Sequence, residues 1–144
     1  MTAILITKLL LLTIWIVYSL LEGYREAIFY YFAVSSSRKM IEMHPTFTFQ
    51  RVLVFGGFAI LLLLMSCTWV VSLLSFIGYA CVFSFLHDGF YYVTRNKLDN
   101  SIYPKKWWDF STTSTAKSDK FLTSVNRTIL VIIGLGLIIT TLFI

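Results

Sequence analysis

"VLVFGGFAILLLLMSCTWVVSLLSFIGYACVFSFL", residues 52–86, is an apolar run of 35 residues that decides the fold. As one helix it would extend about 52 Å, but a bilayer core is only about 30 Å thick, and tilting cannot absorb the difference. We therefore predict two membrane helices with a tight turn around Trp69 to Ser72, where the run is locally more polar and a tryptophan suits the interface.

Apolar stretches on either side of this run complete the fold prediction. Residues 3–21 and 125–144 are each long enough for one membrane span. The 144-residue chain is 58% hydrophobic and 13% charged, and its mean hydropathy of +0.79 lies outside the range of soluble proteins. The sequence predicts an all-α integral membrane protein, a four-helix transmembrane bundle that forms one domain over residues 1–144.

The predicted spans follow from where apolar and polar segments alternate. Nothing breaks the first helix after Leu21, so we expect it to project from the membrane. The expected helices cover residues 3–33, 50–69, 72–95 and 122–144, and the two basic, aromatic-rich connectors cover 34–49 and 96–121.

Basic residues predict the orientation of the chain. Of the 12 lysines and arginines, all except Lys8 lie in or beside the two connectors. Four spans put both connectors on one side, which the positive-inside rule makes cytoplasmic, with both termini on the other side. We expect a multi-pass protein of a bacterial inner (plasma) membrane. Membrane orientation already explains the basic residues, so no nucleic-acid partner is expected.

Two polar stripes are predicted to meet near the cytoplasmic end of the bundle. One lies on the first helix and the other on the third, at similar depth, where an ionisable side chain is costly unless it is paired. The members of this predicted polar cluster are Glu22, Arg25, Glu26, His87, Asp88, Tyr91 and Arg95.

Three interpretations of this cluster remain open. It can be a buried network of salt bridges and hydrogen bonds that fixes helix register. It can be a site for a divalent metal (Zn, Mn or Fe), with ligands from Glu22, Glu26, His44, His87 and Asp88. The small number of histidines and the nearby Arg25 argue against a metal. It can also be a polar pathway that relays protons or lines a vestibule in an oligomer.

Nucleophilic catalysis finds little support in the sequence. Ser84, His87 and Asp88 are close along one helix, but neighbouring helical residues point about 100° apart, so we expect no Ser-His-Asp relay from them.

The second connector carries a candidate membrane-surface segment. Lysines beside tryptophans suit the anionic inner leaflet, with aromatic rings in the interface and ammonium groups on lipid headgroups. Its residues are Lys105, Lys106, Trp107, Trp108 and Asp109.

The first function hypothesis is a non-enzymatic binding or accessory protein that acts on an ion, a lipid or a protein partner. The alternative is a metal-dependent membrane enzyme that uses Glu, His and Asp ligands. A second alternative is an oligomeric channel or a holin-like pore component, for which the chain would form a homo-oligomer.

Overall fold

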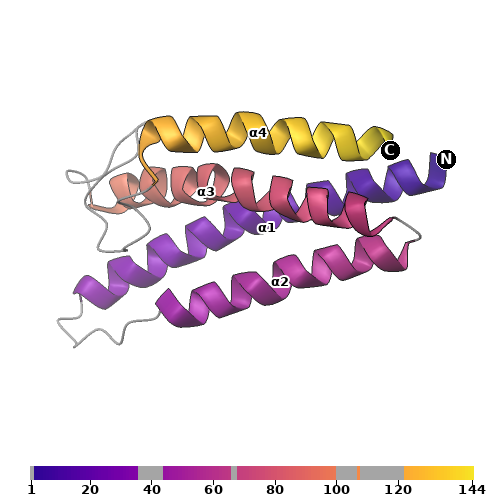
Figure 1. Ribbon diagram of the computed structural model, residues 1–144. Helices are drawn as coiled ribbons and strands as arrows, with labels where there is room; N and C mark the ends of the chain where they lie inside the picture. Colours follow the sequence, from indigo (N-terminus) through magenta and orange to yellow (C-terminus); the bar gives the residue numbers. More distant parts are fainter. Residues whose placement is uncertain (1, 36–43, 66–67, 100–106, 108–121) are drawn as a thin grey trace.

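The computed structural model contains four helices in the order α1 (Thr2–Ser35), α2 (His44–Leu64), α3 (Trp69–Asp99) and α4 (Ser124–Phe143) (Figure 1). The structure describes residues 2–35, 44–65, 68–99, 107 and 122–144. Each of the four helices is long and apolar enough to cross a membrane. The prediction of an all-helical protein with four potential membrane spans is therefore confirmed.

The long apolar run divides into two helices, but the break falls earlier than Trp69 to Ser72. Helix α2 ends at Leu64 and α3 already begins at Trp69. Thr68 sets this start, because its hydroxyl accepts a hydrogen bond from the Val71 amide at 3.3 Å, as an N-cap residue does. Trp69 is the first residue of α3 rather than part of the turn, and its side chain is 70% exposed.

The boundaries of α2 and α4 also have local causes. Helix α2 begins at His44 rather than near residue 50, because a proline in the first helical turn, here Pro45, costs no hydrogen bond. Helix α4 begins after Thr123, whose side chain accepts from the Asn126 amide at 3.3 Å.

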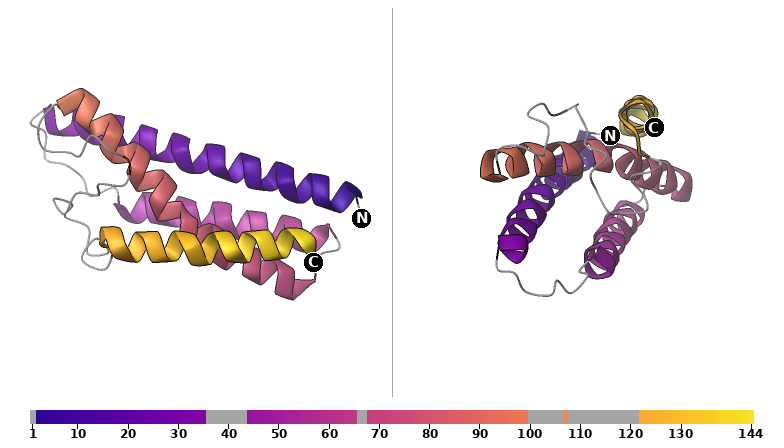
Figure 2. Two further views of the ribbon diagram at one scale, coloured as in Figure 1. Left: turned by 90° about the horizontal axis from the view of Figure 1, so that it is seen from above. Right: turned by 90° about the vertical axis from the view of Figure 1, so that its left-hand side faces the viewer.

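Helix α3 is the central element of the bundle. It packs most extensively against α4 and α1 and also contacts α2, whereas α1 touches α4 only lightly. Helices α1 and α2 do not pack closely against each other in the part of the chain that the structure describes. The end-on view in Figure 2 shows them apart from each other, on the same side of α3. Both termini lie at the end of the bundle where α2 passes into α3 (Figure 1).

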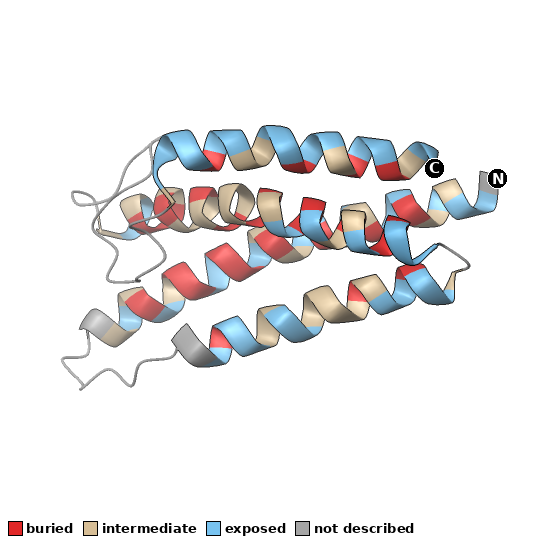
Figure 3. Cartoon of the chain, viewed as in Figure 1, coloured by how far each residue is buried: buried red, intermediate tan, exposed pale blue. Residues whose placement is uncertain are grey.

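Aromatic side chains fill the space between the helices where the backbones do not approach. Trp15 of α1 is fully buried and stacks on Tyr79 of α3 with ring centroids 4.9 Å apart, and it also meets Phe55 of α2 at 6.4 Å. Exposed positions cover most of the outer surface of the helices (Figure 3), as expected for faces that contact lipid. The core cluster comprises Leu11, Trp15, Phe58, Leu62, Tyr79, Val82, Phe83 and Ile138.

Glycines mark the two places where helices cross most closely. A Cβ atom at Gly23 of α1 would overlap the backbone carbonyl oxygen of His87 in α3. A Cβ atom at Gly134 of α4 would lie 2.8 Å from the carbonyl oxygen of Gly78 in α3. Small residues allow such backbone contact between membrane helices, so these glycines fix how α1 and α4 lie on α3.

Lys8 joins the first and last helices at the end that carries the termini. Its ammonium group is buried and donates a 2.7 Å hydrogen bond to the carbonyl oxygen of Thr141, in the last turn of α4. A cation at this position satisfies a terminal carbonyl and complements the negative end of the helix dipole.

Gly23→Ala is expected to lower the free energy of unfolding by about 1–3 kcal/mol. The new methyl group would meet backbone atoms of α3, which can move only if the two helices separate. Thermal and denaturant unfolding of the full chain in detergent micelles measures this. Gly136→Ala is the matched control, because a Cβ atom there meets nothing within 4 Å. Equal losses for both variants would contradict the close crossing.

Candidate functional site

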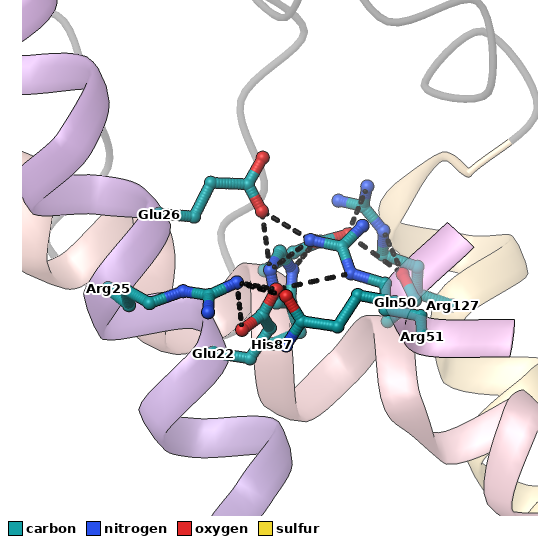
Figure 4. A network of polar contacts seen from close by, with 9 residues as sticks. Glu22, Arg25, Glu26, Gln50, Arg51, His87 and Arg127 are labelled. Carbon is teal, nitrogen blue, oxygen red and sulfur yellow. Dashed lines mark hydrogen bonds and ion pairs between the residues drawn. The ribbon is translucent and has the colours of Figure 1, made fainter. Parts of the chain in front are cut away.

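All four helices contribute to one buried constellation of polar side chains, which we call the charged network. Figure 4 shows its side chains converging from separate helices between α1 and α3. The members are Glu22, Arg25 and Glu26 of α1, Gln50 and Arg51 of α2, Ser84, His87 and Asp88 of α3, and Arg127 of α4.

His87 lies at the centre of the charged network. Its Nδ1 is 2.6 Å from Oδ1 of Asp88, and its Nε2 is 2.8 Å from Oε2 of Glu26. The same Nε2 is also 2.8 Å from Nη2 of Arg51. One imidazole ring therefore connects α3 to both α1 and α2.

Together with Gln50, whose Oε1 accepts from Arg25, Arg51 connects α2 to the charged network. Its Nη2 forms a short ion pair with Oε2 of Glu26, and its Nε lies 3.8 Å from Oε1 of Glu22. The guanidinium is centred 5.3 Å from the ring of Phe83, within the range of a cation–π contact. A long side chain thus spans a gap that the backbones of α1 and α2 leave open.

Arg127 attaches α4 to the charged network. Its side chain is only 1% exposed, its Nη2 is 2.8 Å from Oδ2 of Asp88, and its Nε donates to the hydroxyl of Ser84 at 3.0 Å. Ser84 in turn donates to Oδ2 of Asp88 at 2.9 Å. This closed set of bonds holds α4 against α3.

Formal charges balance within the charged network. Three carboxylates face three guanidiniums, in the pairs Glu22 with Arg25, Glu26 with Arg51, and Asp88 with Arg127. Buried charges such as Glu22, Glu26 and Arg127 require such pairing, because an unpaired charge in a medium of low dielectric constant is expensive.

His87 adds a group that can carry one proton or two. With one proton, Nδ1 can donate to Asp88 while Nε2 accepts from Arg51. With two protons, both ring nitrogens donate, to Asp88 and to Glu26. The arrangement can therefore hold a proton between carboxylates of two helices, in addition to binding the helices together.

The structure brings most of the predicted polar cluster together. Glu26 of α1 does meet His87 of α3, and the ring of Tyr91 lies nearly parallel to that of His87 with centroids 6.4 Å apart. Arg95 instead pairs with Asp99 at 3.0 Å, because a partner at i+4 on its own helix is within easy reach.

Ser84, His87 and Asp88 are in contact, but not in the order that a Ser-His-Asp relay requires. Neighbouring His87 and Asp88 do contact each other, because rotation of both side chains brings their polar atoms to 2.6 Å despite the 100° between their Cα positions. Ser84 bonds to Asp88 and not to His87. A Ser-His-Asp relay is therefore still not formed by these three residues.

The sequence pattern missed Gln50, and it counted Arg51 and Arg127 as basic residues in or beside the connectors without placing them in the polar cluster. Each arginine lies within the first turns of its helix, where a basic residue resembles the edge of a loop. A periodic signal for Arg127 was present: it shares the buried face of α4 with Gly134, Ile138 and Thr141, at spacings of seven, four and three that place all of them on one side of a helix.

The described side chains do not form a metal site. Among them, no group of three or more His, Cys, Asp or Glu residues is placed to hold an ion. Guanidinium groups occupy the positions next to Glu22, Glu26 and Asp88 where a cation would bind. The side chain of His44 lies outside the described residues.

One residue of the predicted membrane-surface segment can be placed. Trp107 docks on α3: its Nε1 donates to the carbonyl oxygen of Phe85 at 2.9 Å, and its ring occupies the space beside Gly89 where a Cβ atom would stand. The other four residues, Lys105, Lys106, Trp108 and Asp109, lie outside the described residues.

Comparison with known proteins gives no relative from which a function could be transferred. No protein-family model matches the chain, and neither a curated protein nor a solved structure shows significant similarity to it. The function must therefore be argued from the geometry of the charged network.

Arg127→Met is expected to lower the free energy of unfolding by about 3–5 kcal/mol, because it leaves the buried Asp88 carboxylate without its cation. Adding Asp88→Asn should restore part of this loss, since the remaining buried charge is then removed. Denaturant unfolding in detergent micelles measures all three variants, the single substitutions and the double, as a double-mutant cycle. Purely additive losses would show that the ion pair does not couple α3 to α4.

Proposed function

We propose that this chain is a non-enzymatic multi-pass membrane protein that acts as a binding or accessory component. In this proposal the charged network holds the four helices together, and the end of the bundle that carries the connectors binds an ion, a lipid or a protein partner. The observation that carries the proposal is the pairing of every network carboxylate with an arginine.

Burial of the network supports this proposal over catalysis. The side chains of Glu22, Glu26 and His87 are 2%, 6% and 6% exposed. A general acid, a general base or a metal ligand must reach a substrate or an ion, but these groups bond to one another. Their geometry favours cohesion of the bundle.

The pore alternative has less support from the described residues. At the end that carries the termini, the interior between the helices contains Leu11, Leu62 and Ile138, and the buried ammonium group of Lys8 is bonded to a backbone carbonyl. Neither feature provides a polar path across the bundle. Ion flux through liposomes, together with the detergent-corrected oligomeric mass, distinguishes a pore from a binding protein.

We also propose that the charged network lies toward the cytoplasm of a bacterial inner membrane. The support is the distribution of basic residues, all of which except Lys8 lie in or beside the connectors.

Metal analysis tests the non-enzymatic proposal. The full chain, purified from cells grown with added Zn, Mn and Fe, is expected to contain far less than one equivalent of each, because arginines occupy the cation positions. Mass spectrometry of the digested protein measures the content. One equivalent of a metal that disappears in both His87→Ala and Glu26→Ala would favour the metal-dependent enzyme instead.

Reporter fusions test the orientation. Alkaline phosphatase fused after Ile144 is expected to be active, and green fluorescent protein fused there to be dark, because the C-terminus is proposed to lie outside the cytoplasm. Fusions that end within 36–43 should show the opposite pattern. Matching reporter activities at both positions would contradict the proposed topology.

A further inference from the structure

One nitrogen of His87 faces two partners that need opposite things from it (Figure 4). Its Nε2 lies 2.8 Å from Oε2 of Glu26 and 2.8 Å from Nη2 of Arg51. An ionised carboxylate can only accept a hydrogen bond, and a guanidinium can only donate one. Nε2 therefore either carries a proton and donates to Glu26, or carries none and accepts from Arg51. A single proton decides which of the two contacts is a hydrogen bond.

The other ring nitrogen takes no part in this choice. Nδ1 is 2.6 Å from Oδ1 of Asp88, whose other oxygen, Oδ2, bonds to Arg127 and to the hydroxyl of Ser84. A carboxylate that is held ionised by an arginine needs a donor at Nδ1, so Nδ1 keeps its proton in both states of the ring. The variable proton is the one on Nε2, at the junction of α1 and α2.

The charge balance around the ring changes with this proton. The charged groups that contact the ring are Glu26 of α1, Arg51 of α2 and Asp88 of α3, and Arg127 of α4 reaches it through Asp88. Without the proton on Nε2, the three carboxylates of the charged network balance its three guanidiniums. With it, the network gains a positive charge at hydrogen-bond distance from the guanidinium of Arg51, where like charges repel.

The two partners of Nε2 differ in how freely they can move. Glu26 stands three residues after Gly23, where a Cβ atom would overlap the backbone carbonyl oxygen of His87 itself. Helix α1 thus cannot withdraw from the ring unless this backbone crossing opens. Arg51 belongs to α2, which does not pack closely against α1 and packs less extensively on α3 than α1 and α4 do. Arg51 is therefore the partner that yields.

Helix α2 is held differently at its two ends. At its C-terminal end the chain passes from Leu64 directly to Trp69 of α3 over four residues, and Leu62 is buried in the core. At its N-terminal end α2 is attached by side chains, through Arg51 and through Gln50, which accepts from Arg25. Loss of the contact between Arg51 and His87 can therefore tilt α2 about its C-terminal end.

We propose that the proton on Nε2 of His87 is a switch for the position of α2. Without the proton, Arg51 holds α2 to the ring; with it, the ring bonds to Glu26 and the N-terminal end of α2 moves away from α1. Acidification therefore loosens α2 while α1, α3 and α4 stay together, in the manner of histidines that change an interface when they are protonated. This inference goes beyond the proposed binding function, because it rests only on the contacts of His87.

Distances between two spin labels measure the movement of α2 directly. The labels are attached in Leu21→Cys and Phe49→Cys, at exposed positions of α1 and α2, in the full chain with both native cysteines replaced by alanine. Pulsed electron paramagnetic resonance in liposomes is recorded at pH 8 and pH 5, on either side of the usual histidine pKa of about 6.5. The distance is expected to be longer at pH 5 by about 2 Å, the size of helix shifts in switching proteins.

Two controls identify the cause of the change. Labels in Leu10→Cys and Leu64→Cys, at exposed positions near the other end of α1 and α2, should give equal distances at both pH values, because α2 tilts about that end. His87→Gln removes the titrating ring and should abolish the change between the first pair of labels. His44→Gln replaces the other histidine of the chain and should preserve it.

Nitrogen NMR of the otherwise unmodified chain provides a test that does not depend on how His87→Gln folds. The histidines are labelled with ¹⁵N, and His44→Gln assigns the signals of His87. At pH 8 His87 is expected to show a protonated Nδ1 and an unprotonated Nε2, and at pH 5 two protonated nitrogens.

Four outcomes would overturn the switch. They are an unchanged distance between the first pair of labels, an equal change between the second pair, a change that persists in His87→Gln or is lost in His44→Gln, and one protonation state of His87 at both pH values. Any of these with a metal-free protein would reject the switch and leave the proposed function standing, whereas stoichiometric metal would reject the proposed function itself.

Discussion

The contact of His87 with Glu26 and Arg51 is the interaction on which the rest of the structure depends. It joins α1, α2 and α3 at one point, and Asp88 extends it to α4 through Arg127. In a medium of low dielectric constant each of these groups is tolerated only with its partners. A shift of any helix along its axis would separate an ion pair, so the network selects one register for the whole bundle.

Two different modes of association hold the helices. Where Gly23 and Gly134 allow close approach, backbones of α1 and α4 lie directly on α3. Between α1 and α2 the backbones stay apart, and long side chains such as Arg51, together with rings such as Trp15, fill the distance. Glycine crossings thus set the positions of α1 and α4, while α2 depends more on polar and aromatic bridges.

The three arginines of the charged network differ in exposure, although each pairs with a carboxylate. Arg25 is the most exposed of the three, and its pairing with Glu22 lowers the cost of burying the Glu22 carboxylate. Arg51 and Arg127 pair with Glu26 and Asp88 further inside the bundle, and all three pairs serve cohesion, because no carboxylate of the charged network is left without a cationic partner.

The sequence by itself determined that the chain is helical, that the apolar run of residues 52–86 must break into two spans, and that Glu22, Glu26, His87 and Asp88 gather near one end. These conclusions follow from the length of a helix relative to a bilayer and from spacing along a helix face, both of which are local properties.

Only the tertiary structure decided the partners. Arg51 and Arg127 stand near the starts of two predicted spans, and a charge-orientation rule counts them without saying where they point. Whether such a residue pairs across helices depends on glycine crossings that bring distant positions together, and that information is not contained in any single segment.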